Sequence, residues 1–272
     1  MLLQEIIRGV RNGKMLFVFI ASLLLMFLSD YASVFKLMTF ADLDAPDLRG
    51  NDQAIQHLVT NGWNTYHVWI KSFDFLALIF PLLAALPYAS SFLIERESRY
   101  YYFILTRAPY WSYIRIKWAV ACIVGGLAIV IPELVYYVVI SLIFRNEILD
   151  PFMYEPSGIF ASLFSTTPEL YIGIVLITHF LLGAMFSAIA ITLASLSKHL
   201  AVVYIGPFLL FTVSSIVLEA FLSLHAFSPL QWYQMTFSRH VEVYTLYIPL
   251  VLVILCSAFI YFRQAGRVIT SG

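Results

Sequence analysis

A series of long apolar runs constrains this chain more than any other feature. A helix that crosses a bilayer needs about 20 mostly apolar residues, and six runs reach that length: 15–35, 73–94, 118–144, 170–197, 200–222 and 243–262. Only 12% of the 272 residues are charged, about half of the share in soluble domains. The sequence therefore predicts an all-α, polytopic membrane protein whose residues 1–272 form a single transmembrane domain.

The distribution of charge predicts how these runs are oriented. Basic residues gather in every second connection, and cytoplasmic connections of membrane proteins are enriched in Lys and Arg. The cytoplasmic side would then hold Arg8, Arg11, Lys14, the basic residues of 95–117, Lys198, Arg263 and Arg267. We expect a multi-pass protein of the cell membrane with both termini in the cytoplasm and residues 36–72 as an outer loop.

Two further segments are apolar but too short to span. Within residues 1–14, Leu2, Leu3, Ile6, Ile7 and Val10 recur at helical spacing with charged residues between them, which predicts an amphipathic helix in the membrane interface. Residues 224–233 precede the last run and predict a re-entrant or interfacial pair of short helices. Trp232 and Tyr233 would lie there at the depth of the lipid headgroups.

Small residues and prolines predict how the runs pack. The fourth run carries small residues at helical spacing, which permit close helix approach; we favour packing within the bundle over a subunit interface for Gly183, Ala184, Ser187, Ala188, Ala190, Ala194 and Ser195. Neighbouring helices can satisfy the carbonyls that a proline frees in a membrane. We therefore expect kinks rather than helix ends at Pro81, Pro87, Pro132, Pro207 and Pro249.

Glu133 is the one acidic residue deep inside a run, beside Pro132. An intramembrane carboxyl is costly and usually faces a cavity or a partner. His179 is the partner expected from its depth in the fourth run. Two interpretations stay open: Glu133 and His179 form a polar contact on a transport path, or they hold helices together.

The sequence lacks the common motifs for nucleotide binding and hydrolysis. No G-x-x-x-x-G-K-[ST], H-E-x-x-H or G-x-S-x-G occurs, so neither a P-loop nor those catalytic sites are expected. The six histidines show no metal-ligand spacing, and the net charge is zero. We therefore expect no enzyme activity, catalytic residue, metal or cofactor in this chain, and membrane lipid rather than nucleic acid around it.

Residues 95–117 combine basic and aromatic side chains between two predicted spans. Arg96, Arg99, Arg107, Arg115 and Lys117 face only two acidic residues there. Arginine and aromatic residues are enriched both at protein–protein contacts and at membrane interfaces. The segment predicts a helix along the membrane, a turn and entry into the next span, acting either as a docking site for a soluble protein or as a membrane anchor.

Three features together resemble the ABC-2 type permeases, which are the membrane subunits of a class of ABC transporters. They are the six-span layout after an amphipathic helix, the acidic start Glu95-Arg96-Glu97 with a turn at 105–109 leading to Lys117, and the segment 228–232 before the last span. In the family a Gly-Thr commonly follows the acidic start; here Arg99-Tyr100 stands nearby.

This resemblance implies a transport subunit that uses ATP and Mg²⁺ held by a separate ATPase. A second permease chain, identical or related, would complete the translocation path. The segment 95–117 would couple the two proteins, and the residues implied in this contact are Glu95, Arg96, Glu97, Arg99, Tyr100, Phe103 and Arg107.

The abundance of aromatic residues favours export of an amphiphilic cargo such as a peptide, a lipid-like molecule or a drug. Two other hypotheses come from different classes. One is a ligand-sensing or immunity subunit that captures a ligand with the 36–72 loop. The other is an intramembrane enzyme that uses Glu133 and His179, which would require the two side chains to lie within hydrogen-bond distance.

Overall fold

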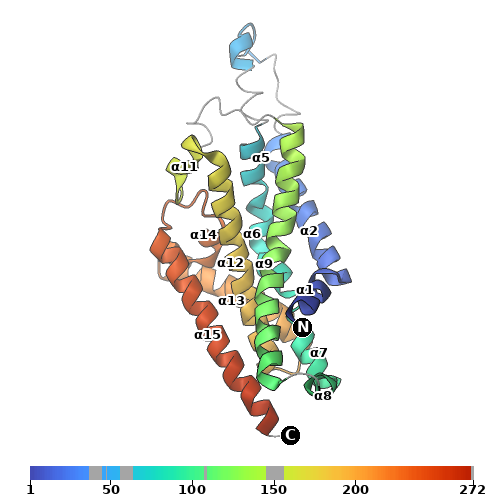
Figure 1. Ribbon diagram of the computed structural model, residues 1–272. Coiled ribbons are helices and arrows are strands. Elements are labelled where there is room, and N and C mark those ends of the chain that lie inside the picture. The colour runs from blue at the N-terminus through green and yellow to red at the C-terminus, as the bar shows by residue number, and fades with distance from the viewer. Residues whose placement is uncertain (37–44, 47, 56–63, 107–108, 145–155, 271–272) are drawn as a thin grey trace.

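The computed structural model describes residues 1–36, 45–46, 48–55, 64–106, 109–144 and 156–270. These residues form an elongated bundle of helices without a strand (Figure 1). Five helical segments are long and apolar enough to cross a membrane: α2 with η1 (Gly13–Phe35), α9 (Tyr110–Ile143), α12 (Pro168–Leu196), α13 with η2 (Leu200–Phe221) and α15 up to Gly266. The bent pair α5 (Thr65–Lys71) and α6 (Phe73–Ala85) brings the number to six if it forms one span.

α12 lies at the centre of the bundle and contacts α6, α9, α13 and α15. It approaches α9 most closely at Gly125, where an added Cβ would lie 2.2 Å from the Cβ of Ser187 and 2.9 Å from the carbonyl oxygen of Gly183. The small residues predicted in this helix are all buried. They allow two long backbones to pack directly against each other within one chain.

The second predicted span, 73–94, has different bounds in the structure. It begins earlier, with α5, and bends by 47° at Ser72 before α6. It also ends earlier, at Ala85, because Pro87 has no N–H with which to continue the helical ladder. Pro87 therefore follows a helix end, whereas the other four prolines lie inside helices as expected. Residues 65–71 had been assigned to the outer loop because His67, Lys71 and Ser72 interrupt their apolar character.

The third span also begins earlier than predicted, at Tyr110 instead of residue 118. Its first two turns contain Arg115 and Lys117, which kept them out of an apolar window. The last helix, α15 (Val243–Thr270), extends beyond the predicted end at 262. Charged residues thus made the predicted spans too short, because a helix can continue through charged residues that are hydrated or paired.

Short elements cover the two ends of the bundle. α1 (Leu2–Val10), α7 (Ser91–Glu97), α8 (Tyr101–Leu105) and both termini lie toward one end, and α5 and α11 (Ala161–Thr166) lie toward the other (Figure 1). η3 (His225–Phe227) and α14 (Pro229–Tyr233) fill the segment before α15. Placing both termini at one end agrees with an even number of crossings.

Candidate functional site

The segment between the second and third spans folds into two short helices that we call the connector, residues 91–109. α7 ends at Glu97 with Ser98 as its C-cap, and Arg99 then adopts a left-handed backbone conformation with φ of 57°. This conformation reverses the chain into α8, and Pro109 precedes the first residue of α9 in extended conformation. A left-handed conformation favours glycine and is costly for a residue with a side chain.

Glu95 anchors the inner face of the connector to the bundle. Only 2% of this residue is exposed. Its Oε1 accepts hydrogen bonds from Lys117 Nζ and from Arg8 Nη1, each at 2.7 Å, and its Oε2 accepts one from Tyr113 at 2.7 Å. One carboxylate therefore joins the connector to α1 and to the first turns of α9.

Lys117 and Glu5 complete this buried cluster. Lys117 has no exposed surface, and its ammonium also bonds Glu5 Oε2 at 2.8 Å. Tyr88, in the turn between α6 and α7, donates a hydrogen bond to the same Glu5 oxygen. Burial alone would raise the pKa of Glu5, but Lys117, Tyr88 and Arg8 outweigh it and hold that pKa below its usual value. Two acids and two bases balance the charge of the cluster, so each of its buried charged groups has a counter-charge, while Arg8 stays half exposed.

α1 packs tightly enough to deliver Glu5 and Arg8 to this cluster. Gly9 is buried against α9, and a Cβ there would lie 2.6 Å from Val124. Ile6 and Val10 pack against buried apolar residues of the bundle, while Leu3 and Ile7, at the edge of the same apolar face, are exposed. The apolar face of α1 is thus buried along one edge and open along the other.

Arg96 ties the connector to a fourth element. Its guanidinium donates hydrogen bonds to the carbonyl oxygens of Ser195, at 3.1 Å, and of Ser197. These carbonyls lie at the end of α12, where the last C=O groups of a helix lack intrahelical partners. The connector is therefore bonded to α12, the central helix of the bundle, as well as to α1 and α9.

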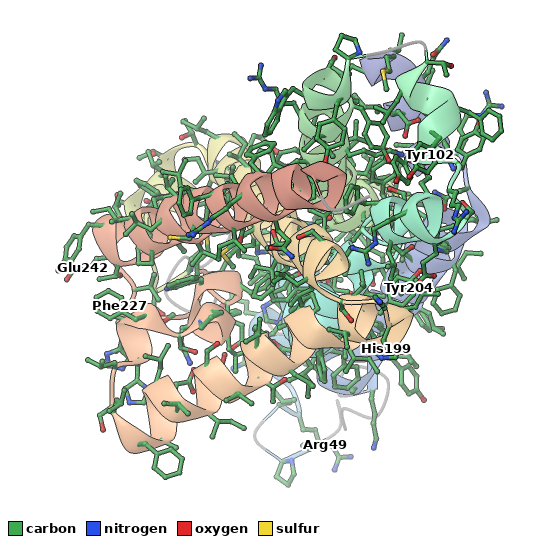
Figure 2. The ribbon with its side chains drawn as sticks, turned by 90° about the horizontal axis from the view of Figure 1, so that it is seen from below. Arg49, Tyr102, His199, Tyr204, Phe227 and Glu242 are labelled. Carbon is green, nitrogen blue, oxygen red and sulfur yellow. The ribbon has the colours of Figure 1, made fainter. Side chains whose placement is uncertain are left out.

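The outer face of the connector is exposed. Glu97, Arg99 and Tyr100 are exposed, and Phe103 and Tyr102 expose 72% and 51% of their surfaces. Figure 2 looks at this end of the bundle from below and shows Tyr102 at its edge. Exposed aromatic and basic side chains of this kind are enriched both at protein–protein contacts and at membrane interfaces.

The predicted docking residues thus separate into two groups. Glu95 and Arg96 point into the bundle, whereas Glu97, Arg99, Tyr100 and Phe103 are on the surface; Arg107 lies outside the described residues. Lys117, counted with the basic residues of this segment, is buried and neutralised. The sequence did not indicate the roles of Glu5, Tyr88 and Tyr113. The one available signal was Glu5, an acid in an otherwise basic amphipathic helix.

A second polar cluster lies in the core of the bundle. His179 Nδ1 is 2.9 Å and 3.0 Å from the two carboxyl oxygens of Glu133, and neither residue is exposed. Tyr233 donates a hydrogen bond to Glu133 Oε1 at 2.7 Å, and its ring stacks on His179 at 4.1 Å. The indole of Trp69 donates to the backbone carbonyl of Glu133 at 3.1 Å.

The hydrogen bonds of His179 determine how many protons this cluster holds. His179 Nε2 is 3.0 Å from the carbonyl oxygen of Tyr233, which can only accept, so Nε2 carries a proton. The Nδ1–Glu133 contact then holds one further proton, on either the imidazole or the carboxyl group. Both arrangements are neutral overall and fully hydrogen-bonded.

The predicted Glu133–His179 contact is therefore present, but the sequence did not indicate Tyr233 as the third member of the cluster. Tyr233 and Trp232 are both buried against the bundle, with 0% and 3% exposed; their position at headgroup depth stays a prediction. Tyr233 also stacks on Phe80 of α6 at 4.3 Å. Aromatic residues at a membrane interface and in a membrane-protein core look alike in sequence, because both environments accept an apolar ring with a polar tip.

In the part of the chain that the structure describes, no three His, Cys, Asp or Glu side chains converge as a metal-binding group. No protein-family model matches the chain, and no curated protein or solved structure is similar to it.

Proposed function

We propose that this chain is a permease subunit of an ABC-2 type transporter, driven by a separate ATPase that docks on the outer face of the connector. One observation carries the proposal. The inner face of the connector is bonded to α1, α9 and α12 through Glu95 and Arg96, while the outer face exposes the aromatic side chains around Phe103.

Such a connector can transmit motion because it is stiff toward the bundle and free on the other side. A partner changes a conformational equilibrium only by binding one state better than the other. An ATPase that closes on ATP would shift the connector, and the buried cluster at Glu95 would carry the shift to α9 while Arg96 carries it to α12. If the connector were loosely attached to the bundle, side-chain rotation would absorb this movement before it reached the spans.

The proposal includes an orientation and an assembly. The connector and both termini would face the cytoplasmic side of the cell membrane, as the basic residues indicate. The segment containing α14 would be the re-entrant segment on the outer side. A second permease chain would complete the path for an amphiphilic cargo, and we propose export as the direction. ATP and Mg²⁺ would be held by the ATPase.

The Glu133–His179–Tyr233 cluster supports the structural interpretation of Glu133. It joins α9, α12 and α14, its polar atoms are satisfied, and none of the three side chains is exposed. The distance required by the intramembrane-enzyme hypothesis is met, but a substrate would have no exposed atom of the pair to reach. Much of the loop on which the sensing hypothesis depends lies outside the described residues.

Purification of the tagged chain from its own cells tests the proposal. We expect an ATPase with a nucleotide-binding site to copurify, and Phe103→Asp to reduce its yield at least fivefold. Phe227→Asp is the matched control, because Phe227 is also an exposed aromatic residue (39%) and is labelled on the far side of Figure 2 from Tyr102. Absence of any such ATPase, or equal loss in both variants, would contradict the proposal.

A further inference from the structure

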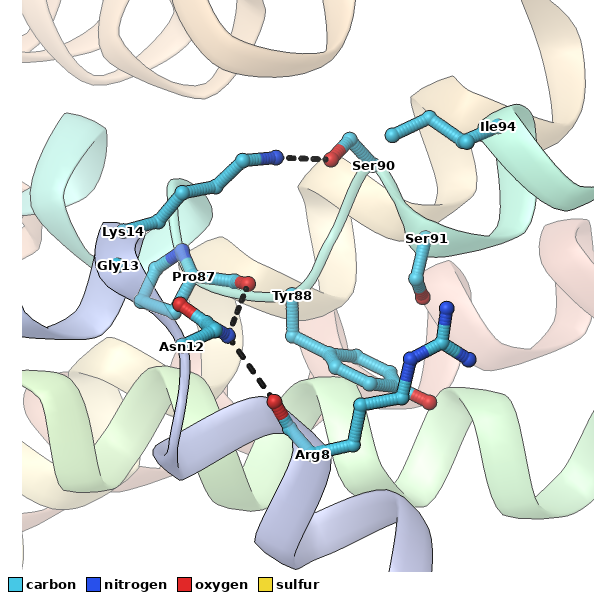
Figure 3. A pocket seen from close by; sticks show the side chains of 9 residues that line it. All are labelled: Arg8, Asn12, Gly13, Lys14, Pro87, Tyr88, Ser90, Ser91 and Ile94. Carbon is cyan, nitrogen blue, oxygen red and sulfur yellow. Dashed lines mark hydrogen bonds between the residues drawn. The ribbon is translucent and has the colours of Figure 1, made fainter.

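The surface beside the α1–α2 turn has two adjoining hollows with different linings. The first, about 440 Å³, is lined by Arg8, Lys14, Tyr88, Ser90 and other residues of the turn after α6 (Figure 3). The second, about 460 Å³, is mostly apolar and is lined by Met15, Leu16, Phe19 and Ile131, with Arg11 at its side. Asn12 and Gly13 line both hollows, so the two are neighbours across the turn.

The polar hollow carries positive charge that no acid neutralises. Lys14 Nζ bonds only hydroxyl groups, those of Ser90 at 3.1 Å and Tyr204 at 2.7 Å. Among the described residues, neither Lys14 nor Arg11 forms an ion pair. The nearby acids, Glu5 and Glu95, are already balanced by Lys117 and Arg8.

The hollows lie where a membrane-spanning helix begins, because the first span starts at Gly13. Leu2, Leu3 and Ile7 of α1 present exposed apolar surface beside this point. A hollow with Lys14 and Arg8 at its wall next to a hollow lined mainly by apolar side chains matches the two parts of a phospholipid, the anionic phosphate and the acyl chain. Basic pockets between membrane helices bind anionic headgroups through the same chemistry.

We propose that this pair of hollows is a binding site for an anionic glycerophospholipid. The phosphate and headgroup occupy the hollow of Arg8 and Lys14, and one acyl chain occupies the hollow of Leu16 and Phe19. Each hollow falls in the size range of small-molecule sites. The bound lipid bridges α1, α2 and the turn at Ser90, and therefore holds the interfacial helix against the bundle. This inference does not depend on the transport proposal.

The test measures binding of the full chain, freed of endogenous lipid, to phosphatidylglycerol and to phosphatidylcholine by native mass spectrometry. We expect at least tenfold preference for phosphatidylglycerol. Lys14→Gln keeps a donor near Ser90 but removes the charge, and should lower phosphatidylglycerol affinity at least fivefold. Lys198→Gln, an exposed cation in the turn between α12 and α13, should leave it within twofold.

A second variant separates binding from folding and from simple phosphate capture. A Cβ at Gly13 meets nothing within 4 Å, so Gly13→Leu should fold normally; because Gly13 lines both hollows, the leucine would project into the space where they meet and should reduce the preference. Soluble glycerol 3-phosphate should not compete at millimolar concentration, because it lacks the chain. Equal binding of the two lipids, unchanged binding by Lys14→Gln and Gly13→Leu, or full competition by glycerol 3-phosphate would each overturn the proposal.

Discussion

Replacing Lys117 by Met should destabilise the protein strongly, because this lysine is the shared cation of a buried cluster. Its side chain has no exposed surface and bonds Glu5 at 2.8 Å and Glu95 at 2.7 Å. Removing one member of a buried ion pair costs about 3–5 kcal/mol, since the remaining charge stays buried. Arg8 still lies 2.7 Å from Glu95, so we expect the lower end, about 3 kcal/mol.

Arg115→Met is the matched control, two residues earlier on α9 but exposed, and should change the free energy of unfolding by less than about 0.5 kcal/mol. Reversible unfolding in mixed micelles, followed by circular dichroism, measures both values. Combining Lys117→Met with Glu95→Gln removes one charge of each sign. The double variant should lose about 1–3 kcal/mol less free energy of unfolding than the two single variants lose together. A cost below about 1 kcal/mol for Lys117→Met, or strict additivity, would refute the cluster as the anchor of the connector.

Three further predictions test individual groups. The pKa of Glu5 is lowered in the folded protein. Ionised Glu5 therefore contributes fully to the free energy of unfolding above its unfolded pKa of about 4.3, and this contribution is lost as pH falls through the folded pKa. Between pH 5 and pH 3, the melting temperature of Glu5→Gln should therefore fall by less than that of the wild type. Arg99→Gly relieves a left-handed backbone conformation and should raise the free energy of unfolding by about 1 kcal/mol, whereas Ser98→Gly, at φ of −75°, should not raise it. Tyr233→Phe removes the hydrogen bond to Glu133 and should cost about 1–3 kcal/mol in the same unfolding assay. Tyr261→Phe should be neutral, because that buried hydroxyl has no partner in the described part of the chain.

The arrangement of spans could be predicted from the sequence because bilayer thickness fixes the length of an apolar helix. The fourth, fifth and sixth predicted runs each fall on one helical segment of the structure. The second and third differ at their starts, where polar residues interrupt the apolar window, and the second also differs at its end, where Pro87 follows the last residues of α6. Lys117 shows the reason: its charge is satisfied by Glu5, more than a hundred positions away in the chain, and no local pattern contains that information.

The candidate site could be predicted in location but not in geometry. Clustering of Arg and aromatic residues located the connector, and the shared depth of Glu133 and His179 predicted their contact. Which side of the connector faces inward depends on α1 and α12 together, through Glu95 and Arg96. Tyr233 joins the core cluster because α14 folds back into the bundle. Such partners are set by tertiary packing, which a single sequence does not record.

Site-specific photo-crosslinking at position 103 tests the central claim most directly. A photoreactive phenylalanine analogue at Phe103 keeps the size of a side chain that is 72% exposed, and crosslinking in intact cells captures the native neighbour. We predict that the captured protein is an ATPase with a nucleotide-binding site, and that the same analogue at Phe227 does not capture it. Labelling of a Phe103→Cys variant by a membrane-impermeant thiol reagent added outside the cell, or capture of only lipid at position 103, would contradict the account.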